Sequence, residues 1–327
     1  MSALAFPGGA WPVMLTPFTD DNQVDYEALK ALTKWYIDNG CSGLFANCQS
    51  SEMFFLSLEE RVKIAKTVME VAAQTKASSL SVLPQGSCVP VIVSGHIADS
   101  IEDQIAELQE IAKTKPAALI FITNRFAKED ESDEVWRANC QKVMDALPED
   151  LPLGMYECPY PYKRLISIEN LTWCANTGRF YFLKDTCCDL KTIVERIDAV
   201  KGTNLKIYNA NTTTLLDSLV AGAHGFSGVM ASFQMSEYAY LCKHALDKDE
   251  QSIATNNKLQ DLLTVTSLIE RQYYPVNAKY YLKTYEHLPM GTFTRVKDHS
   301  LLVETLKQDV AALKRLSDSV VASLGIK

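Results

Sequence analysis

The chain has 327 residues, of which 47% are hydrophobic and 22% charged, as expected for a globular protein with a large core. The formal net charge of −8 and the pI near 5.3 argue against nucleic-acid and anionic-membrane partners, which need a basic surface. No apolar run approaches the roughly 20 residues of a membrane span, and residues 1–13 do not resemble a signal peptide, so we expect a cytoplasmic protein.

Eight short apolar segments, rich in β-branched and aromatic residues, are typical of buried strands. In chain order the predicted strands are residues 11–16, 43–47, 90–94, 118–123, 152–156, 180–184, 205–208 and 224–230. Amphipathic segments separate them and predict helices over residues 25–40, 57–74, 100–113 and 133–147. The second of these begins with a capping box formed by Ser57 and Glu60.

This alternation predicts an α/β protein in which a (β/α)8 TIM barrel occupies residues 1–233. No GxGxxG motif follows the first predicted strand, which argues against the alternative, an open dinucleotide-binding sheet. After the barrel the pattern is only helical, so we expect residues 234–327 to form a helical extension packed on it.

The cysteines and histidines do not indicate a metal site. The nine cysteines are scattered, odd in number and without a Cys-x-x-Cys pair, so we expect reduced thiols rather than disulfides or a zinc site. His96 and His224 lack a second ligand at metal spacing, and we interpret them as core or solvated residues.

In a (β/α)8 barrel, functional side chains lie at the carboxyl ends of the strands. Tyr156 and Lys184 end two consecutive predicted strands, so their side chains can meet inside the barrel mouth. Burial would lower the pKa of the lysine, and a neutral amine can attack a ketone to form a Schiff base. Taken singly, Lys184 is better explained by a surface pair with Asp185, and Tyr156 by an ordinary amphipathic tyrosine; the functional interpretation rests on their joint placement.

An ordered set of motifs resembles the dihydrodipicolinate synthase / N-acetylneuraminate lyase family over nearly the whole chain. The motifs are TPF (16–18), a polar turn ending at Glu52, Tyr-x-x-Pro (156–159), Lys-Asp (184–185) and GAHGFSG (222–228). The resemblance implies a class I, Schiff-base aldolase or lyase that assembles as a homotetramer or dimer and uses no cofactor beyond its own lysine imine.

The resemblance also implies roles for individual residues. Lys184 is expected to form the imine with pyruvate or another 2-oxo acid, and Tyr156 to carry protons. We expect substrate contacts from polar residues at the strand ends, with Ser50 and its neighbouring amides holding the 2-oxo acid carboxylate. The expected substrate-binding residues are Gln49, Ser50, Ser51, Asn209 and Ser227.

The chain departs from the family pattern at three positions. Gln49 stands where a relay hydroxyl is usual, and an amide cannot pass a proton as a hydroxyl does. Phe126 replaces a tyrosine that many members lend to a neighbouring subunit, and Pro161 replaces the arginine of the lysine-biosynthesis enzymes. Lys163 or Arg164 could substitute for that arginine only from a different backbone position.

The chain shares some features of the sialate lyases and lacks others. Gly228 resembles their side of the family, whereas Asn211 and Thr212 replace their acidic pair.

Three functions remain open from the sequence. The first is an aldolase or lyase that acts on a 2-oxo-3-deoxy acid. The second is a sugar-acid dehydratase that uses the same imine, and the third is an altered family member that binds 2-oxo acids without turnover.

Overall fold

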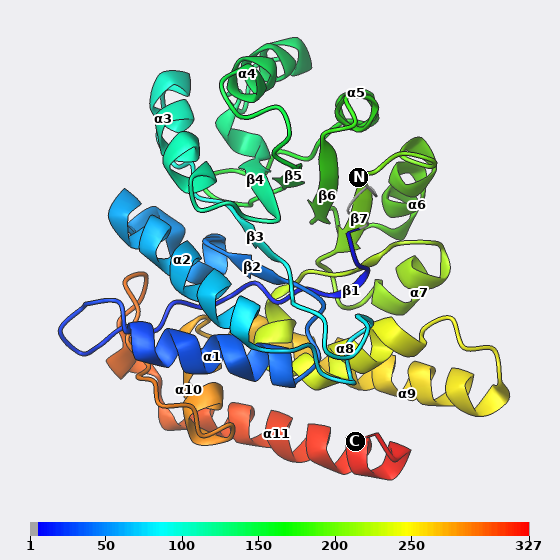
Figure 1. The fold of residues 1–327 in the computed structure, drawn as a ribbon. Helices are drawn as coiled ribbons and strands as arrows, with labels where there is room; N and C mark the ends of the chain where they lie inside the picture. The colour runs from blue at the N-terminus through cyan, green and yellow to red at the C-terminus, as the bar shows by residue number, and fades with distance from the viewer. Residues whose placement is uncertain (1–5, 327) are drawn as a thin grey trace.

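The computed structural model describes residues 6–326, whose parallel strands form a closed ring inside a layer of helices (Figure 1). The sheet runs in the order β1-β8-β7-β6-β5-β4-β3-β2, and every pairing is parallel. A parallel bridge between Val13 and Phe45 joins the segment after β1 to β2 and closes the ring. The strands are β1 (Gly9–Ala10), β2 (Leu44–Ala46), β3 (Val91–Val93), β4 (Ala118–Ile122), β5 (Leu153–Tyr156), β6 (Phe180–Asp185), β7 (Lys206–Asn209) and β8 (Gly225–Phe226). The predicted (β/α)8 barrel is therefore confirmed.

The first and last strands are shorter than the sequence predicts. Residues 11–16 contribute only the bridge at Val13, in part because Pro12 has no N–H to donate to a ladder. The predicted strand 224–230 pairs only at Gly225–Phe226, after which Val229–Ser232 turns into the short 3-10 helix η4. Both differences lie at the seam where the barrel closes.

The helices that follow the strands surround the barrel (Figure 1). Their bounds are α1 (Tyr26–Asp38), α2 (Leu58–Gln74), α3 (Ile101–Ala112), α4 (Asp133–Asp145), α5 (Ile168–Asn176), α6 (Leu190–Ala199), α7 (Leu215–Val220) and α8 (Met235–His244). The capping box of α2 is confirmed, because the Glu60 amide donates to Ser57 Oγ at 3.1 Å and the Ser57 amide donates to Glu60 Oε2 at 2.8 Å.

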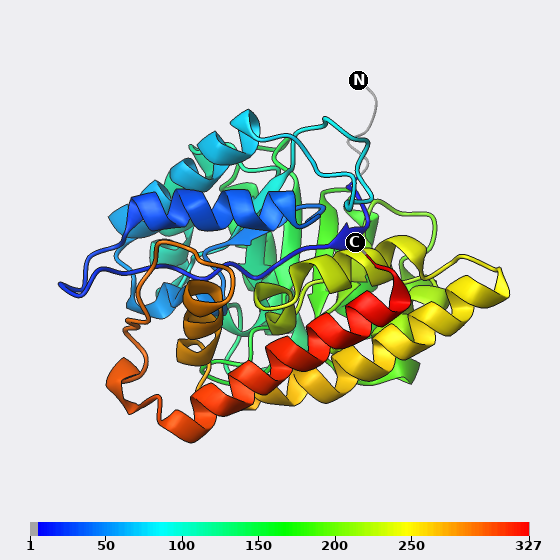
Figure 2. The ribbon, with the colours of Figure 1, turned by 90° about the horizontal axis from the view of Figure 1, so that it is seen from below.

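The C-terminal helices lie together along one side of the barrel (Figure 2). They are α9 (Glu250–Thr266), α10 (Val276–Thr284) and α11 (Glu304–Leu324), with the 3-10 turns η5 (Ser267–Arg271) and η6 (His299–Leu301) between them. Helix α8 packs on β1, β8 and α7, in the position of the eighth barrel helix. The predicted division between residues 233 and 234 therefore falls one helix too early, and the extension begins with α9.

Aromatic side chains fill the interior of the barrel. Phe182 and Tyr208 stack with ring centroids 4.0 Å apart, and Trp11 meets both rings edge-on. Phe45 lies above this group and contacts both Phe182 and the ring of Tyr156 edge-on. This packed interior closes the lower end of the barrel and leaves the carboxyl ends of the strands open. Within residues 6–326, none of the helices is long and apolar enough to cross a membrane.

Closure of the barrel at β1 and β8 depends on the absence of a side chain at Gly225. A Cβ atom there would lie 2.0 Å from the carbonyl oxygen of Gly9. We expect Gly225→Ala to lower the free energy of unfolding by about 1–3 kcal/mol or more, as measured by urea denaturation. Gly291→Ala is the matched control, because its Cβ would approach no other atom closer than 3.5 Å. Equal stability of the two variants would contradict this account of the seam.

Candidate active site

The ends of β5 and β6 bring Lys184 and Tyr156 together. The two residues are register partners on adjacent strands, and Lys184 Nζ lies 4.3 Å from the centroid of the Tyr156 ring. Both side chains are buried, at 4% and 3% exposure. Burial lowers the pKa of the Lys184 ammonium and raises that of the Tyr156 phenol. The pair therefore combines an amine that loses its proton easily with a hydroxyl that stays protonated.

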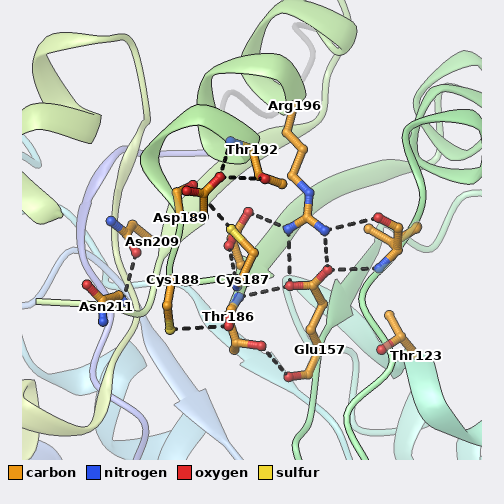
Figure 3. Close-up of polar contacts among 12 residues, drawn as sticks. Thr123, Glu157, Thr186, Cys187, Cys188, Asp189, Thr192, Arg196, Asn209 and Asn211 are labelled. Carbon is orange, nitrogen blue, oxygen red and sulfur yellow. Dashed lines mark hydrogen bonds and ion pairs between the residues drawn. The ribbon is translucent and has the colours of Figure 1, made fainter.

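Lys184 does not pair with its sequence neighbour Asp185. Successive side chains of a strand point to opposite faces, so Lys184 faces the barrel interior and Asp185 faces the surrounding helices. There, Arg196 of α6 donates to Asp185 Oδ2 at 2.5 Å and to Glu157 Oε1 at 2.7 Å (Figure 3). All three charged side chains are fully buried. The surface-pair interpretation of Lys184 is therefore wrong.

The buried cluster of Arg196, Glu157 and Asp185 also holds the segments that follow the two strands. Glu157 accepts hydrogen bonds from the backbone amides of Ile166 and Thr186, both at 2.9 Å. Asp185 accepts one from the amide of Cys187 at 2.8 Å. These contacts fix the backbone immediately beyond Tyr156 and Lys184, and so position the two side chains.

A cavity of about 670 Å³ opens above this pair. Gln49 and Ser50, from the 3-10 turn η1 (Gln49–Ser51), line it at the level of Tyr156. The tyrosine hydroxyl lies 3.4 Å from Gln49 Oε1, the contact that replaces the usual hydroxyl relay. Phe54 and Tyr160 line the outer part, with their rings edge to face at 4.8 Å. The cavity has the size and partly apolar walls of a small-molecule site.

The expected substrate-binding residues are not all brought together. Gln49 and Ser50 line the cavity, whereas Ser51 turns away and donates to the carbonyl oxygen of Met14 at 2.6 Å. The Asn209 amide donates to the hydroxyls of Thr214 and Ser218 outside the lining, at 2.9 and 3.0 Å.

Ser227 is also outside the lining. It is fully buried, and its hydroxyl has no hydrogen-bond partner within the described chain. In this structure, Ser51, Asn209 and Ser227 support the walls of the cavity and do not face it.

Of the residues that depart from the family pattern, some line the cavity and others lie away from it. Lys163 lines the cavity, whereas Arg164 donates to Asp133 and to backbone carbonyls away from it. Phe126 is buried and stacks on His96, with centroids 5.4 Å apart. Asn211 lines the cavity, but the Thr212 hydroxyl is bonded to Tyr238.

Gly228 is required where it lies, because a Cβ atom would meet the Phe226 ring at 2.3 Å and the Ala210 carbonyl oxygen at 2.5 Å. At Gly228, just before η4, the wall of the cavity is therefore formed by backbone alone.

The C-terminal extension contributes a wall of the cavity that the sequence analysis did not predict. Glu270 and Arg271 of η5, followed by Tyr274, line it together with Lys297. The signal available in the sequence was Pro275, which interrupts the helical pattern between α9 and α10 and marks a turn there. The direction of that turn depends on tertiary packing.

A buried ion pair attaches the extension to the η1 turn. Lys279 of α10 donates to Glu52 Oε1 at 2.7 Å, and the Arg295 amide donates to Glu52 Oε2 at 2.6 Å. Glu52 itself has a left-handed backbone, with φ of 61°. Burial lowers the pKa of Lys279 to about 8, although Glu52 opposes the shift. The carboxylate of Glu52 is thus occupied by structural contacts.

His96 and His224 each accept a hydrogen bond from a backbone amide. His96 Nε2 accepts a hydrogen bond from the Ile122 amide at 2.6 Å and its Nδ1 lies 2.9 Å from Gln104 Oε1. His224 Nδ1 accepts from the Ile207 amide at 3.3 Å. Burial lowers the pKa of each to about 4, so both are neutral at pH 7. Of the residues that the structure describes, no three His, Cys, Asp or Glu side chains are grouped as metal ligands, and all nine cysteines are free thiols.

A buried lysine beside a tyrosine, at the open end of a (β/α)8 barrel, defines the class of barrel lyases of the aldolase type. The sequence matches the Dihydrodipicolinate synthetase family over residues 7–81 and 138–304. The chain therefore belongs to this family, as its motifs predicted.

Curated relatives are similar over most of their length. The 4-hydroxy-tetrahydrodipicolinate synthase of Clostridium perfringens is 25% identical over 304 residues, covering 91% of this chain and 97% of that protein. The enzyme of the same name from Pseudoalteromonas atlantica is 24% identical over 238 residues, covering 73% of this chain and 75% of that protein.

Solved structures share the fold. A catalytic lysine mutant of the sialic acid aldolase of Ruminococcus gnavus aligns with a TM-score of 0.83 at 16% identity, over 99% of this chain and 100% of that one. The dihydrodipicolinate synthase of Acinetobacter baumannii, complexed with pyruvate, aligns with a TM-score of 0.77 at 20% identity, over 98% and 99% of the two chains.

The contribution of the buried cluster to stability can be tested by replacing Arg196. Replacing it with methionine would leave Glu157 and Asp185 buried without their cation, so we expect Arg196→Met to lower the free energy of unfolding by about 3–5 kcal/mol in urea denaturation. Arg315→Met, at an exposed position of α11, should change it by less than about 0.5 kcal/mol. A stable Arg196→Met variant would show that the cluster does not hold the strand ends.

Proposed function

We propose that this protein is a class I aldolase that forms an imine between Lys184 and a 2-oxo acid such as pyruvate. In the cleavage direction it would split a 2-oxo-3-deoxy acid into pyruvate and an aldehyde, and in the other direction it would join them. The observation that carries the proposal is the desolvated Lys184 amine, 4.3 Å from the Tyr156 ring at the base of the cavity. Family membership supports it independently.

The chemistry follows from the state of the amine. A neutral Lys184 can attack the ketone carbon, and loss of water then gives a protonated imine. That imine draws electrons from the adjacent carbon–carbon bond, so the carbanion left by cleavage is stabilised as an enamine. Such a reaction needs no cofactor beyond the lysine, because the imine itself is the electron sink.

The turn η1 is the candidate site for the carboxylate of the 2-oxo acid. Ser50 lines the cavity beside Gln49, at the level where the Tyr156 hydroxyl points. A carboxylate bound there would place the ketone carbon between Lys184 and Tyr156. The rest of the cavity, which extends past Phe54 and Tyr160, would then hold the part of the substrate released as the aldehyde.

Trapping of the imine tests the proposal directly. Incubation with pyruvate and sodium borohydride should add one reduced pyruvate to Lys184, detected by mass spectrometry of the digested protein. Lys184→Met should abolish the adduct. Lys191→Met, at an exposed position shortly after β6, should keep it. Absence of any adduct on the wild-type protein would remove the proposed function.

The role of Tyr156 has its own test. Tyr156→Phe keeps the ring and removes the hydroxyl, so we expect exchange of the pyruvate methyl hydrogens in D₂O, followed by NMR, to slow by about 10²–10⁴-fold. Tyr181→Phe is the matched control, because Tyr181 lies on β6 outside the cavity lining. Unchanged exchange in Tyr156→Phe would show that another group transfers these protons.

A further inference from the structure

The Tyr156 hydroxyl has a limited route for passing on a proton. Its hydrogen-bond partner is the Gln49 side-chain oxygen at 3.4 Å, and an amide cannot relay a proton as a hydroxyl can. Cleavage of a carbon–carbon bond beside a hydroxyl needs a base for that hydroxyl and then an acid for the enamine carbon, and one group or two can serve these steps. A second titratable group on the far side of the cavity would take the first step from Tyr156.

Two carboxylates line the cavity in the part of the chain that the structure describes. Glu52 is buried and occupied by Lys279 and the Arg295 amide. Glu270 is only half-buried, and across residues 6–326 no lysine, arginine or histidine lies within ion-pair distance of it. Of the two, Glu270 is the one available to a substrate.

The position of Glu270 relates it to Lys184. It lies on η5 of the C-terminal extension, whereas Lys184 ends β6, so the two line the cavity from different elements. They are close enough to influence each other electrostatically: Glu270 raises the pKa of Lys184, against the larger lowering by burial. Burial raises the pKa of Glu270 itself, against the lowering by Arg271 and Lys184, so its protonated form is easier to reach than that of an exposed glutamate.

We infer that Glu270 is a catalytic acid–base group of the proposed reaction, acting on the C4 oxygen of a 4-hydroxy-2-oxo acid held as the Lys184 imine. In cleavage, the Glu270 carboxylate takes the proton of the C4 hydroxyl, the C4–O bond becomes a carbonyl and the C3–C4 bond breaks. The electron pair of that bond passes to the imine, which becomes an enamine. In condensation the protonated Glu270 returns its proton to the aldehyde oxygen. The inference rests on the proposed function.

Other charged and titratable groups face the same space and belong in any account of its pH dependence. Arg271 lies beside Glu270 on η5, and Tyr274 follows it. The remaining groups come from β5, β6, the loops after both strands, the residue that follows η1 and the loop after α10, namely Tyr156, Lys184, Tyr160, Lys163, Cys188, Glu52 and Lys297. Burial raises the pKa of Tyr156 and Tyr274 well above the usual value for a phenol, so both stay protonated while Glu270 titrates.

The test separates the partial reactions in Glu270→Gln, with Glu250→Gln, an exposed position on α9, as matched control. We expect Glu270→Gln to keep borohydride trapping of pyruvate and exchange of its methyl hydrogens in D₂O. Its kcat for condensing pyruvate with glyceraldehyde, or with other hydroxyaldehydes of a panel, should fall by about 10²–10⁴-fold. Glu270→Asp should recover part of that loss, and Glu250→Gln should match the wild type.

A second measurement needs no aldehyde. Because the Glu270 charge favours the ammonium form of Lys184, Glu270→Gln should move the midpoint of the pH profile for pyruvate trapping to lower pH, and Glu250→Gln should not. A residue whose charge does not reach Lys184 would not shift this profile.

The outcomes are distinguishable. A wild-type protein that traps no pyruvate defeats the proposed function. If the wild type forms the imine, the role of Glu270 is overturned by an unmoved pH midpoint, by an unchanged kcat, by a change confined to KM, or by a wild type that condenses no aldehyde of the panel.

Discussion

The site depends on one constraint. The buried amine of Lys184 is kept apart from the carboxylate of Asp185, its neighbour in sequence. Lys184 and Asp185 are neighbours, yet the alternation of β6 sends one into the barrel and the other toward α6. Arg196 binds Glu157 (Figure 3) and also Asp185, so both negative charges are neutralised behind the strands. Left without an ion pair and buried, the amine has a lowered pKa, so a larger share of it is neutral at a given pH.

The C-terminal extension is part of the site as well as a cover for the barrel. Through Lys279 it holds Glu52, and so the turn that carries Gln49 and Ser50. Through η5 it closes one side of the cavity with Glu270 and Tyr274 (Figure 2). The barrel strands therefore supply the group that would bind the 2-oxo acid, while the extension shapes the space for the rest of the substrate. With this division, the residues of the extension can change without changing the strand ends that carry Lys184 and Tyr156.

The departures from the family pattern leave Lys184 and Tyr156 in place. Gln49 replaces a relay hydroxyl, Phe126 is packed against His96 away from the cavity, and Lys163 lines the cavity near the position where a substrate-binding arginine is usual. The lysine and tyrosine at the strand ends are kept. This pattern is what a retained imine chemistry with a different second substrate would produce, because the first steps need only the amine and phenol.

The sequence by itself determined the barrel, the family and the meeting of Tyr156 with Lys184, because strand periodicity and the parallel order of strands are local and repetitive properties. It did not determine which polar side chains face the cavity: Ser51, Asn209 and Ser227 are in the right segments, but their side chains turn to neighbouring groups or into the packing. Nor could it place Glu270, 86 residues beyond Lys184 (270 − 184), beside the same cavity. Only tertiary packing decides the direction of a turn such as η5, because contacts distant in sequence, such as Lys279 with Glu52, fix it.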